Sequence, residues 1–410
     1  MKDADRALLI VGRAGTGKTT LIKEILKDEE TKQVVLAPTG VAAIAVGGQT
    51  LHSFFRIPPG LNNPNGLEPL PGKPAKLIKS LHRIIIDEIS MVRADLLDMV
   101  DHRLRTVRED NSPFGGVQII MVGDFYQLPP VLTWNEREVF EEIYDSNFVF
   151  SAKVFRLLPL YTIELGKVYR QPDAHFVELL GNIRTGSRID ATLRELNDAC
   201  VKEHRAGKTP MLLTAYNDVA DRYNRQKLIE LTGEEQVYES EIQGRFDLSR
   251  DHLPAPAILH LKVGARVMML KNDKAGRWVN GSLAIITKLE DIAMKVLVDG
   301  DDMEHLLLRE TWERYAYALQ HGEIAKEVVG KYVQFPVKLA WASTIHKAQG
   351  LTIDDVRLDL SRRSFEKGQT YVALSRATTL DGLSFTAPLD KRDVIVDLDL
   401  PYRLKVDEVV

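Results

Sequence analysis

Short apolar runs alternate with amphipathic segments along the first 155 residues of the chain. The segment 95–107 repeats leucine and valine at helical spacing, which predicts a helix with one buried face. The apolar runs have the length of buried strands and lie at 7–11, 33–37, 83–87 and 118–122. Strands and helices in alternation favour an α/β fold, in which crossover helices connect the strands of a parallel sheet.

A second α/β region is predicted to begin near Thr162. Its expected strands lie at 162–165, 210–214, 337–341, 356–360 and 383–386, and its expected helices at 174–184, 190–204, 217–230 and 368–375. Between them, short apolar runs flank the turn dipeptide Asn280-Gly281 and predict antiparallel strands. We therefore expect a first domain at 1–155, a second at 156–261 and 336–410, and a small β domain at 262–335 inserted into the second.

One stretch interrupts the strand–helix rhythm of the first region. Residues 57–74 are rich in proline, glycine and asparagine, which is typical of a surface insertion. With its flanks it covers 56–80. The stretch could be an idle loop or a functional one, and the residues alone do not separate these alternatives.

A phosphate-binding loop follows the first predicted strand. Residues 12–19 read Gly-Arg-Ala-Gly-Thr-Gly-Lys-Thr, the G-x-x-x-x-G-K-T pattern, with a strand before it and a helix after it. Backbone N–H groups of such a loop converge on an anion, and the helix N-terminus adds a positive dipole end. Lys18 is expected to neutralise the terminal phosphates of a nucleotide, and Thr19 to bind Mg²⁺.

Two carboxylates stand at the end of another predicted strand. The apolar run Arg83–Ile86 is followed by Asp87 and Glu88, at the edge where open α/β sheets bind ligands. Asp87 suits the Mg²⁺ shell, and Glu88 suits orienting or deprotonating a water that attacks the γ-phosphate. An acidic pair here favours hydrolysis over phosphoryl transfer to a metabolite.

Composition narrows the class of protein further. The chain has 54 basic and 58 acidic residues, a net charge of −4, so any nucleic-acid surface has to be a local patch. Its single cysteine, Cys200, excludes a disulfide scaffold and a thiolate zinc cluster, and a reduced intracellular location fits. No membrane span and no targeting segment is expected, so the location is cytoplasmic, or the nucleoid in a bacterium.

Further stretches occur in an order that resembles a known family. They are 37–43 (Ala-Pro-Thr-Gly-Val-Ala-Ala), 50–54 (Thr-Leu-His-Ser-Phe), 86–91 (Ile-Asp-Glu-Ile-Ser-Met), 123–130 (Gly-Asp-Phe-Tyr-Gln-Leu-Pro-Pro), 168–171 (Val-Tyr-Arg-Gln), 343–350 (Ser-Thr-Ile-His-Lys-Ala-Gln-Gly) and 371–377 (Tyr-Val-Ala-Leu-Ser-Arg-Ala). With the phosphate loop, and with Pro113-Phe114-Gly115-Gly116, they resemble the petite-integration-frequency (PIF) helicases of superfamily one, 5′-to-3′ branch, with RecD-like helicases as near relatives.

The resemblance implies a fold and a nucleotide site. The expected architecture is two RecA-like parallel-sheet domains in tandem, with an inserted wedge segment at 56–80 and an inserted small β-barrel-like domain. The implied catalytic residues are Lys18, Glu88, Gln127, Arg170 and Arg376, the arginines closing on the γ-phosphate from the second domain. The implied ATP-binding residues are Gly12, Ala14, Gly15, Thr16, Gly17, Lys18, Thr19, Thr20, Asp87 and Gly350, with Thr19 and Asp87 on Mg²⁺.

A DNA-binding surface is also expected, because translocation needs grip without sequence preference. Hydroxyl and backbone groups contact phosphates, and aromatic rings stack on bases. The candidates are Pro38, Thr39, Gly40, His52, Ser53, Phe54, Ser343, Thr344, His346 and Lys347. Phe54 could instead be a core residue, and His346 a structural histidine. The segment 357–376 has a net charge of +3, which fits a DNA patch or an ordinary solvated face.

The function implied is ATP-dependent 5′-to-3′ translocation on single-stranded DNA with unwinding of duplex. Forked duplexes, G-quadruplexes and DNA–RNA hybrids are the implied substrates, a monomer is the implied DNA-bound state, and repair, recombination, replication and telomere maintenance are the implied roles. Alternatives are a single-strand translocase that does not unwind and a nucleotide-switched regulatory ATPase without a DNA role. The family usually has an adenine-reading glutamine upstream of the phosphate loop. None precedes Gly12, so either the chain is trimmed or base recognition is looser.

Overall fold

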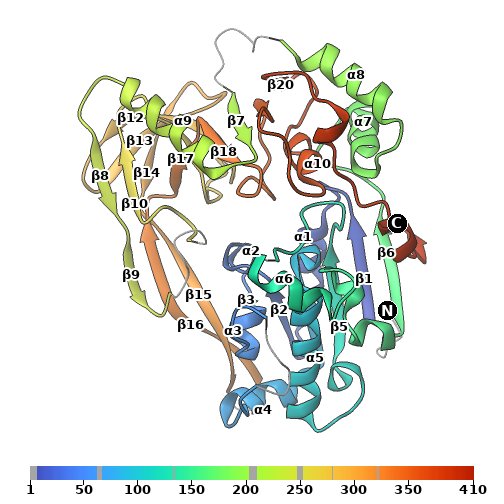
Figure 1. The fold of residues 1–410 in the computed structure, drawn as a ribbon. Coiled ribbons are helices and arrows are strands. Elements are labelled where there is room, and N and C mark those ends of the chain that lie inside the picture. Colours follow the sequence, from blue (N-terminus) through green and yellow to red (C-terminus); the bar gives the residue numbers. More distant parts are fainter. Residues whose placement is uncertain are drawn as a thin grey trace.

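The chain folds into two α/β lobes and a β region that lies beside both (Figure 1). The computed structural model describes residues 7–61, 67–132, 134–202, 210–246, 253–278, 280–320 and 323–410. The first lobe occupies the lower part of Figure 1, the second lobe the upper right and the β region the upper left. Within the described residues, no helix is both long enough and apolar enough to cross a membrane.

The first lobe is built on a parallel sheet with the strand order β21-β6-β1-β5-β4-β2-β3. Its strands are β1 (Ala7–Gly12), β2 (Gln33–Ala37), β3 (Gln49–Thr50), β4 (Arg83–Ile86), β5 (Gln118–Gly123), β6 (Leu160–Leu165) and β21 (Glu408–Val409). Its helices are α1 (Lys18–Ile25), α2 (Gly40–Ala45), α3 (Leu51–Phe55), α4 (Lys73–Ser80), α5 (Ala94–Arg108) and α6 (Trp134–Glu141). The predicted strands at 7–11, 33–37, 83–87 and 118–122 and the helix at 95–107 are confirmed.

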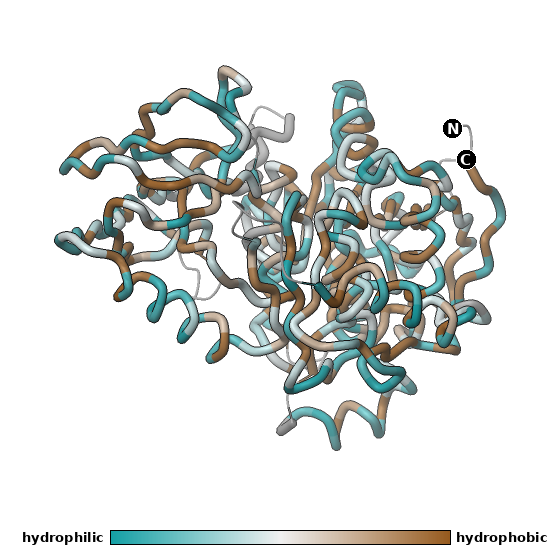
Figure 2. Tube along the Cα trace, turned by 90° about the horizontal axis from the view of Figure 1, so that it is seen from above, coloured by the Kyte–Doolittle hydropathy of each residue, from teal (hydrophilic) through white to brown (hydrophobic). Residues whose placement is uncertain are grey.

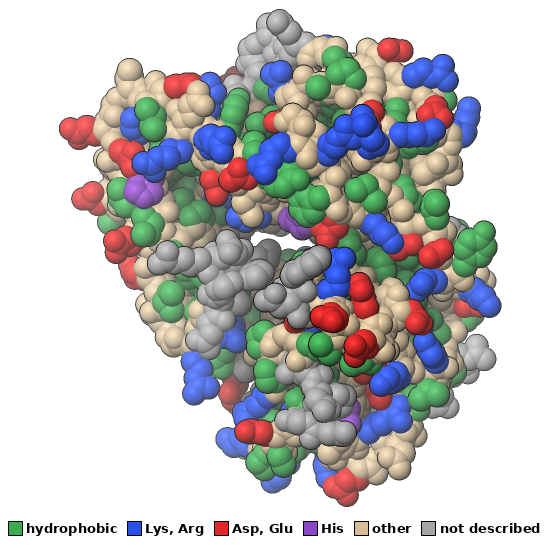
Figure 3. Space-filling model, viewed as in Figure 1, with side chains coloured by type: hydrophobic (Ala, Val, Ile, Leu, Met, Phe, Trp, Pro, Cys, Tyr) green, Lys and Arg blue, Asp and Glu red, His purple; other side chains and the backbone are tan. Residues whose placement is uncertain are grey.

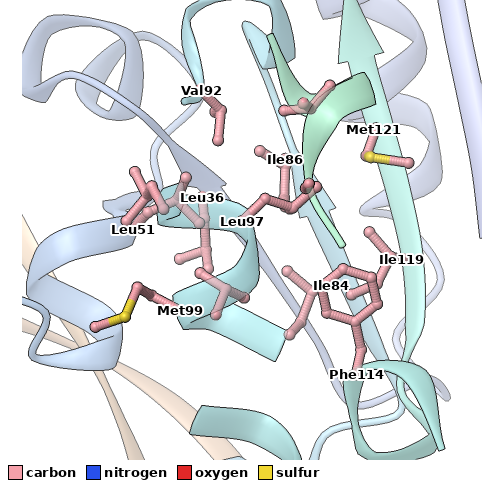
Figure 4. Packing of buried hydrophobic residues seen from close by; sticks show 14 of the residues in the cluster. Leu36, Leu51, Ile84, Ile86, Val92, Leu97, Met99, Phe114, Ile119 and Met121 are labelled. Carbon is pink, nitrogen blue, oxygen red and sulfur yellow. The ribbon is translucent and has the colours of Figure 1, made fainter. Parts of the chain in front are cut away.

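Both faces of this sheet are buried, which explains why its strands are continuous apolar runs. Ile84 and Ile86 on β4 face the larger core beneath α5, together with Phe114 (Figure 4). Ile85, between them, faces the opposite core with Ile22 of α1. Successive side chains of a strand point to opposite faces, so a strand covered by helices on both sides needs apolar residues at every position.

Two strands correct the predicted boundary between the α/β regions. β6 contains the residues assigned to the second domain from Thr162 onward, yet it pairs in parallel with β1 in the first sheet. The C-terminal strand β21 adds to the outer side of β6, and the backbone N–H of Thr162 donates to Asp407 (2.7 Å). Neither a domain start at 156 nor a second domain running to 410 is therefore right. Apolar spacing predicts a strand but not its sheet.

The second lobe has a parallel sheet with the order β18-β7-β19-β20. Its elements are β7 (Met211–Thr214), β18 (Ala342–Thr344), β19 (Val356–Asp359), β20 (Leu383–Phe385), α7 (Ala174–Thr185), α8 (Ile189–Cys200), α9 (Asn217–Glu230), α10 (Gln369–Leu374) and α11 (Leu400–Arg403). Most predicted elements of this lobe are confirmed. Teal and brown segments alternate along the Cα trace of the molecule, as expected of elements with one buried and one exposed face (Figure 2). Cys200 is buried on α8, and burial raises its thiol pKa to about 12, so the thiol is unreactive.

The predicted strand at 337–341 is wrong as a single element. Its first part, β17 (Val337–Leu339), pairs with β11 (Arg266–Met269) in the β region, and β18 starts only at Ala342. The residues between the two strands bond to both sheets: the N–H of Ala340 donates to Arg266 O (3.0 Å), and Trp341 O accepts from Leu212 N (2.8 Å). One apolar run thus serves two sheets.

The β region begins earlier than predicted, at residue 236 rather than 262. Its remaining strands are β8 (Gln236–Glu239), β9 (Glu241–Gly244), β10 (Ile258–Leu261), β12 (Leu283–Leu289), β13 (Ala293–Val298), β14 (Glu304–Leu308), β15 (Glu310–Gln320) and β16 (Glu323–Gln334). The antiparallel pairing of β11 and β12 across Asn280-Gly281 is confirmed. The β8–β10 pair shares one apolar core with the sheet β14-β13-β12-β11-β17, which accounts for the earlier start.

A long hairpin connects the β region to the first lobe. β15 and β16 descend beside α3 and α4 in Figure 1, and Trp312 and Tyr332 pack near Ile44 of α2. Within the 56–80 insertion, Ile57 and Leu70 are buried in the first-lobe core and α4 is helical. The insertion is therefore anchored on both sides, and residues 62–66 lie outside the described residues. Its role as a wedge stays a prediction.

Candidate functional site

The phosphate loop lies between β1 and α1, as its sequence predicts. Gly17 precedes α1 with a left-handed backbone, and Gly15 also has a positive φ of 81°. A Cβ on Gly15 would lie 2.5 Å from Cβ of Arg170, so this glycine allows Arg170, one of the two arginines predicted to close on the γ-phosphate, to approach the loop. The Lys18 ammonium donates to the carbonyls of Gly12 (2.8 Å) and Arg13 (2.9 Å), which holds it over the loop.

A cluster of carboxylates faces Lys18. Asp87 and Glu88 follow β4, and Asp124 follows β5, so all three stand at the carboxyl edge of the sheet. Burial raises the pKa of Asp87, and burial together with the Asp87 charge raises the pKa of Glu88 to about 7. Lys18 opposes both shifts, while burial lowers its own pKa against the attraction of these carboxylates. A carboxylate with a pKa near 7 is suited to accept a proton from water.

Asp124 is a further residue of this site that the sequence did not predict, although it lies inside the stretch 123–130. It forms a buried ion pair with Arg184 of α7 (3.2 Å), and the Arg184 guanidinium stacks 3.9 Å from the Tyr126 ring centroid. Gln127 and the hydroxyl of Tyr371 also donate to Asp124 (3.2 and 3.4 Å). One first-lobe carboxylate therefore contacts two helices of the second lobe. The motif 123–130 identifies the segment in the sequence, but Arg184 and Tyr371 become neighbours of Asp124 only in the folded chain.

The two arginines predicted to close on the γ-phosphate both lie where the two lobes meet, beside the phosphate loop and Asp124. We call this region the seam. Arg170 is on the segment from β6 to α7, between the lobes, and donates to the carbonyl of Ser375 (3.3 Å). Arg376 follows α10, is fully buried, and donates to the carbonyls of Val372 (2.9 Å) and Leu351 (3.2 Å). Burial and the neighbouring Arg170 charge lower the pKa of Arg376 to about 9. An anion between these guanidinium groups would stabilise both charges.

Further contacts close the seam around the phosphate loop. The backbone N–H of Ala14 donates to the Tyr371 hydroxyl (3.3 Å), and that of Tyr169 to the carbonyl of Gly15 (2.8 Å). Gln349 donates to the Gln127 side chain (3.3 Å), which joins two motifs across the lobes. Gly350, the next residue, is exposed and has a positive φ. The structure thus brings the segments 123–130, 168–171, 343–350 and 371–377 together beside the phosphate loop.

The residues predicted to bind Mg²⁺ suit that ion chemically. Thr19 is exposed at the start of α1, and buried Asp87 has one carboxylate oxygen accepting from the Glu88 N–H (2.9 Å). Mg²⁺ prefers oxygen ligands and is commonly held by one or two protein groups, with waters and substrate phosphates completing its shell. In the described residues, no group of three or more His, Cys, Asp or Glu could hold a metal by itself.

The first-lobe residues predicted to bind DNA have mixed surroundings. Thr39, between half-buried Pro38 and buried Gly40, caps α2 by accepting from Ala42 N (3.2 Å). Ser53 accepts from Gln49 (2.8 Å) and from Arg314 of the long hairpin (3.3 Å). His52 is half-buried, and burial lowers its pKa.

The prediction that Phe54 contacts DNA is wrong, because its side chain lies in the core. Its side chain is 7% exposed and belongs to the first-lobe core, with the Phe55 ring edge-on at 4.9 Å. A ring enclosed in this way has no free face for a base. Both phenylalanines of the pair point inward, because α3 is packed between the sheet and α5.

Three of the four second-lobe residues predicted to bind DNA, Ser343, Thr344 and Lys347, line a groove of about 310 Å³. Ser343 and Thr344 are buried at the end of β18, and Lys347 is exposed beyond them. The His346 ring nitrogen Nε2 bonds to Glu366 (2.8 Å), which fits the structural alternative for this histidine. Figure 3 shows an opening between the upper and lower parts of the molecule, with basic and histidine side chains at its rim.

The basic segment 357–376 offers little free charge. Arg376 is buried at the nucleotide seam, Arg362 pairs with Asp218 (2.9 Å) and Lys367 with Asp397 (2.9 Å). These pairs offset much of the +3 counted along the sequence, so the net charge of this segment is that of an ordinary solvated face and gives no support for a charged DNA patch.

Comparison with known proteins gives consistent matches over nearly the whole chain. A family model described as PIF1-like helicase matches residues 1–193, and one described as the 2B domain of the DNA helicase Pif1 matches residues 251–289. The human ATP-dependent DNA helicase PIF1 is 35% identical over 396 residues. The match covers 92% of this chain and 58% of the human protein, so the chain spans little more than half of that relative.

Relatives of similar length also match. The ATP-dependent DNA helicase Pif1 of Bdellovibrio bacteriovorus is 32% identical, with 95% of this chain and 86% of that protein covered. Pif1 from Bacteroides sp in complex with ADP-AlF4 is 37% identical with a TM-score of 0.90, covering 98% of this chain and 94% of that one. Bacteroides Pif1 bound to ssDNA has a TM-score of 0.70 at 38% identity, with 98% and 93% covered. The chain therefore belongs to the PIF1-like helicase family.

Proposed function

We propose that this protein is an ATP-dependent DNA helicase that moves 5′-to-3′ on single-stranded DNA and unwinds duplex ahead of it. The observation that carries the proposal is the seam, where Lys18 and Glu88 of the first lobe meet Arg170 and Arg376. The Glu88 and Arg376 charges act on each other there, and Arg170 bonds to Ser375 of the second lobe. The names of the relatives, ATP-dependent DNA helicases, and the nucleotide-bound and ssDNA-bound Bacteroides structures support it.

In this proposal each residue of the seam has one task in hydrolysis. The loop Gly12–Thr20 holds the phosphates of ATP, and Thr19 and Asp87 would hold Mg²⁺, which would offset the charge of the substrate. Glu88 orients a water for attack on the γ-phosphate and accepts its proton. Arg170 and Arg376 stabilise the negative charge that develops as the bond to the β-phosphate breaks.

The contacts that cross the seam then couple hydrolysis to movement. Asp124–Arg184 and Gln127–Gln349 join the lobes beside Lys18. We infer that ATP and ADP, which differ by the γ-phosphate, favour different arrangements of the two lobes. Opening one base-pair step costs about 1.4 kcal/mol of stacking. A coupling free energy of about 1–3 kcal/mol between the nucleotide and DNA sites is sufficient to bias that step.

The finer parts of the proposal follow from the family resemblance. We infer that the two lobes are RecA-like motor domains, that the β region and its long hairpin hold the strand against them, and that one copy acts on DNA. Forked duplexes, G-quadruplexes and DNA–RNA hybrids are the proposed substrates. An intracellular location in contact with DNA follows from that activity.

ATP turnover with and without single-stranded DNA, measured beside strand displacement, tests this proposal. Turnover is expected to rise with single-stranded DNA, and duplexes with 5′ tails should be displaced in preference to those with 3′ tails. DNA-stimulated turnover without displacement would indicate a translocase that does not unwind. An ATP turnover rate that does not change with DNA would contradict the helicase proposal and indicate a regulatory ATPase.

The insertion at 56–80 is the proposed wedge at the fork. Because Ile57 and Leu70 are core residues, a fair test removes only residues 62–66 and leaves both anchors in place. Strand displacement is expected to fall several-fold while ssDNA-stimulated ATP turnover stays near the wild-type rate, since the seam is untouched. An equal loss of both activities would argue against a wedge.

A further inference from the structure

An exposed aromatic cluster lies on the second lobe beside residues 343–350. Tyr216 immediately precedes α9, and Phe365 lies on the segment between β19 and α10. Their ring centroids are 5.3 Å apart, and the Phe365 ring is nearly parallel to the His346 imidazole, at 6.0 Å and 16°. Phe365 is 54% exposed, so it offers solvent a large apolar ring.

The cluster is held in place by polar contacts around it. The Arg362 guanidinium lies 4.0 Å from the Tyr216 ring centroid and pairs with Asp218 (2.9 Å), which covers one side of the tyrosine. Glu366 bonds to His346 (2.8 Å), and the backbone N–H of Phe365 donates to buried Gln369 (3.1 Å). An exposed ring that is positioned in advance loses little entropy when another flat group covers it.

The groove of about 310 Å³ adjoins this cluster on the side of α9 and β17. Its lining includes Asn217, the neighbour of Tyr216, and Lys347, the neighbour of His346, together with Lys338 of β17. Burial and the Lys347 charge lower the pKa of Lys338 to about 8. Across the described parts of the chain, no carboxylate forms an ion pair with either lysine. A phosphodiester here would stabilise two neighbouring positive charges.

Neighbouring aromatic rings beside two lysines match the two kinds of surface, bases and phosphates, that a single strand of DNA offers. Each nucleotide of single-stranded DNA offers a flat base and a charged phosphate, whereas duplex DNA keeps its base faces covered. We propose that Phe365, supported by Tyr216 and His346, is a stacking platform for a base of single-stranded DNA whose phosphates lie in the groove beside Lys338 and Lys347. The inference rests on the proposed function and assigns to Phe365 the stacking role that the burial of Phe54 rules out there.

Binding of a fluorescein-labelled oligothymidylate to the full chain, followed by anisotropy, tests the platform. Phe365→Ala and Phe365→Leu are expected to weaken binding roughly five- to a hundredfold, because leucine keeps apolar volume but has no π-face. Phe365→Tyr should restore wild-type affinity. Tyr402→Ala removes a ring that is 83% exposed elsewhere on the surface and is the matched control, with affinity and basal ATP turnover unchanged.

A second readout separates stacking from a merely structural effect. The fluorescence of an oligonucleotide containing 2-aminopurine should be quenched when it binds to the wild-type chain or to Phe365→Tyr. It should stay unquenched when the oligonucleotide is bound to Phe365→Leu at saturating protein concentration. Wild-type affinity or quenching in Phe365→Leu would overturn the platform while leaving the helicase proposal in place. A wild-type chain that binds no single-stranded DNA would overturn both.

The phosphate part of the inference has its own test at pH 7. Lys338→Gln is expected to reduce the slope of log affinity against log salt concentration by about 0.7, the value for one phosphate contact on a single strand. Lys391→Gln, at an exposed lysine of the second lobe outside the groove lining, is the control and should leave the slope unchanged. An unchanged slope in Lys338→Gln would remove the phosphate from this groove and overturn that part.

Discussion

Replacing Lys18 with alanine is expected to lower ssDNA-stimulated ATP turnover by about a hundredfold to a thousandfold. Lys18 is the cation of the phosphate loop, and removing one group that stabilises developing negative charge costs about this much. The loss has a second cause. The Lys18 charge lowers the pKa of Glu88, which is about 7 in its presence. Without Lys18 this pKa rises, so a smaller fraction of the Glu88 carboxyl is ionised and able to accept a proton at neutral pH.

The measurement is steady-state ATP turnover at saturating single-stranded DNA, with a thermal melt to show that the variant folds. Lys23→Ala is the matched control, because Lys23 lies on the same helix α1 but is exposed. It should keep the wild-type rate. Undiminished DNA-stimulated turnover in Lys18→Ala would remove the nucleotide assignment.

Replacing Arg376 with alanine is expected to lower kcat by about 10³- to 10⁵-fold with little change in nucleotide affinity, as for other arginine fingers. The guanidinium is already buried at the seam and held by Val372 and Leu351, so its position is fixed before ATP arrives. Preorganised charge of this kind acts on the transition state more than on the bound substrate.

Burial makes the control for Arg376 important. Arg376→Lys keeps a positive charge but not the planar fork, so it should recover only part of the lost rate. A fluorescent ATP analogue measures binding separately from turnover. If Arg170 and Arg376 act on the same phosphate, the double variant should be little slower than the slower single variant. Wild-type turnover in a folded Arg376→Ala protein would end its assignment as a finger.

Most of the nucleotide site could be predicted from the sequence because its chemistry is local. The phosphate loop needs glycines, a lysine and a threonine at fixed spacing, and the acidic pair needs an apolar strand before it. Asp124 shows the limit of such reasoning. It stands in a motif that was recognised, but its pairing with Arg184 joins residues sixty positions apart and depends on how the lobes pack.

Residue patterns also left the direction of some side chains undecided. Phe54 and Phe55 are adjacent, and helical spacing alone would allow one of them to face solvent, yet the sheet and α5 enclose both. Phe365 lies in none of the motifs, and only the tertiary structure shows that its ring is exposed and lies beside Tyr216 and His346.

By itself, the amino-acid order determined the α/β class, the positions of most strands and helices, and the phosphate-loop and acidic residues that we propose for a triphosphate. These depend on backbone geometry and on side chains a few positions apart. Only the tertiary structure decided that β6 and β21 complete the first sheet, that 337–344 is divided between two sheets, and that the β region starts at residue 236. The reason is physical: a strand's own residues specify its extended form and its buried faces, while its partner is chosen by long-range packing.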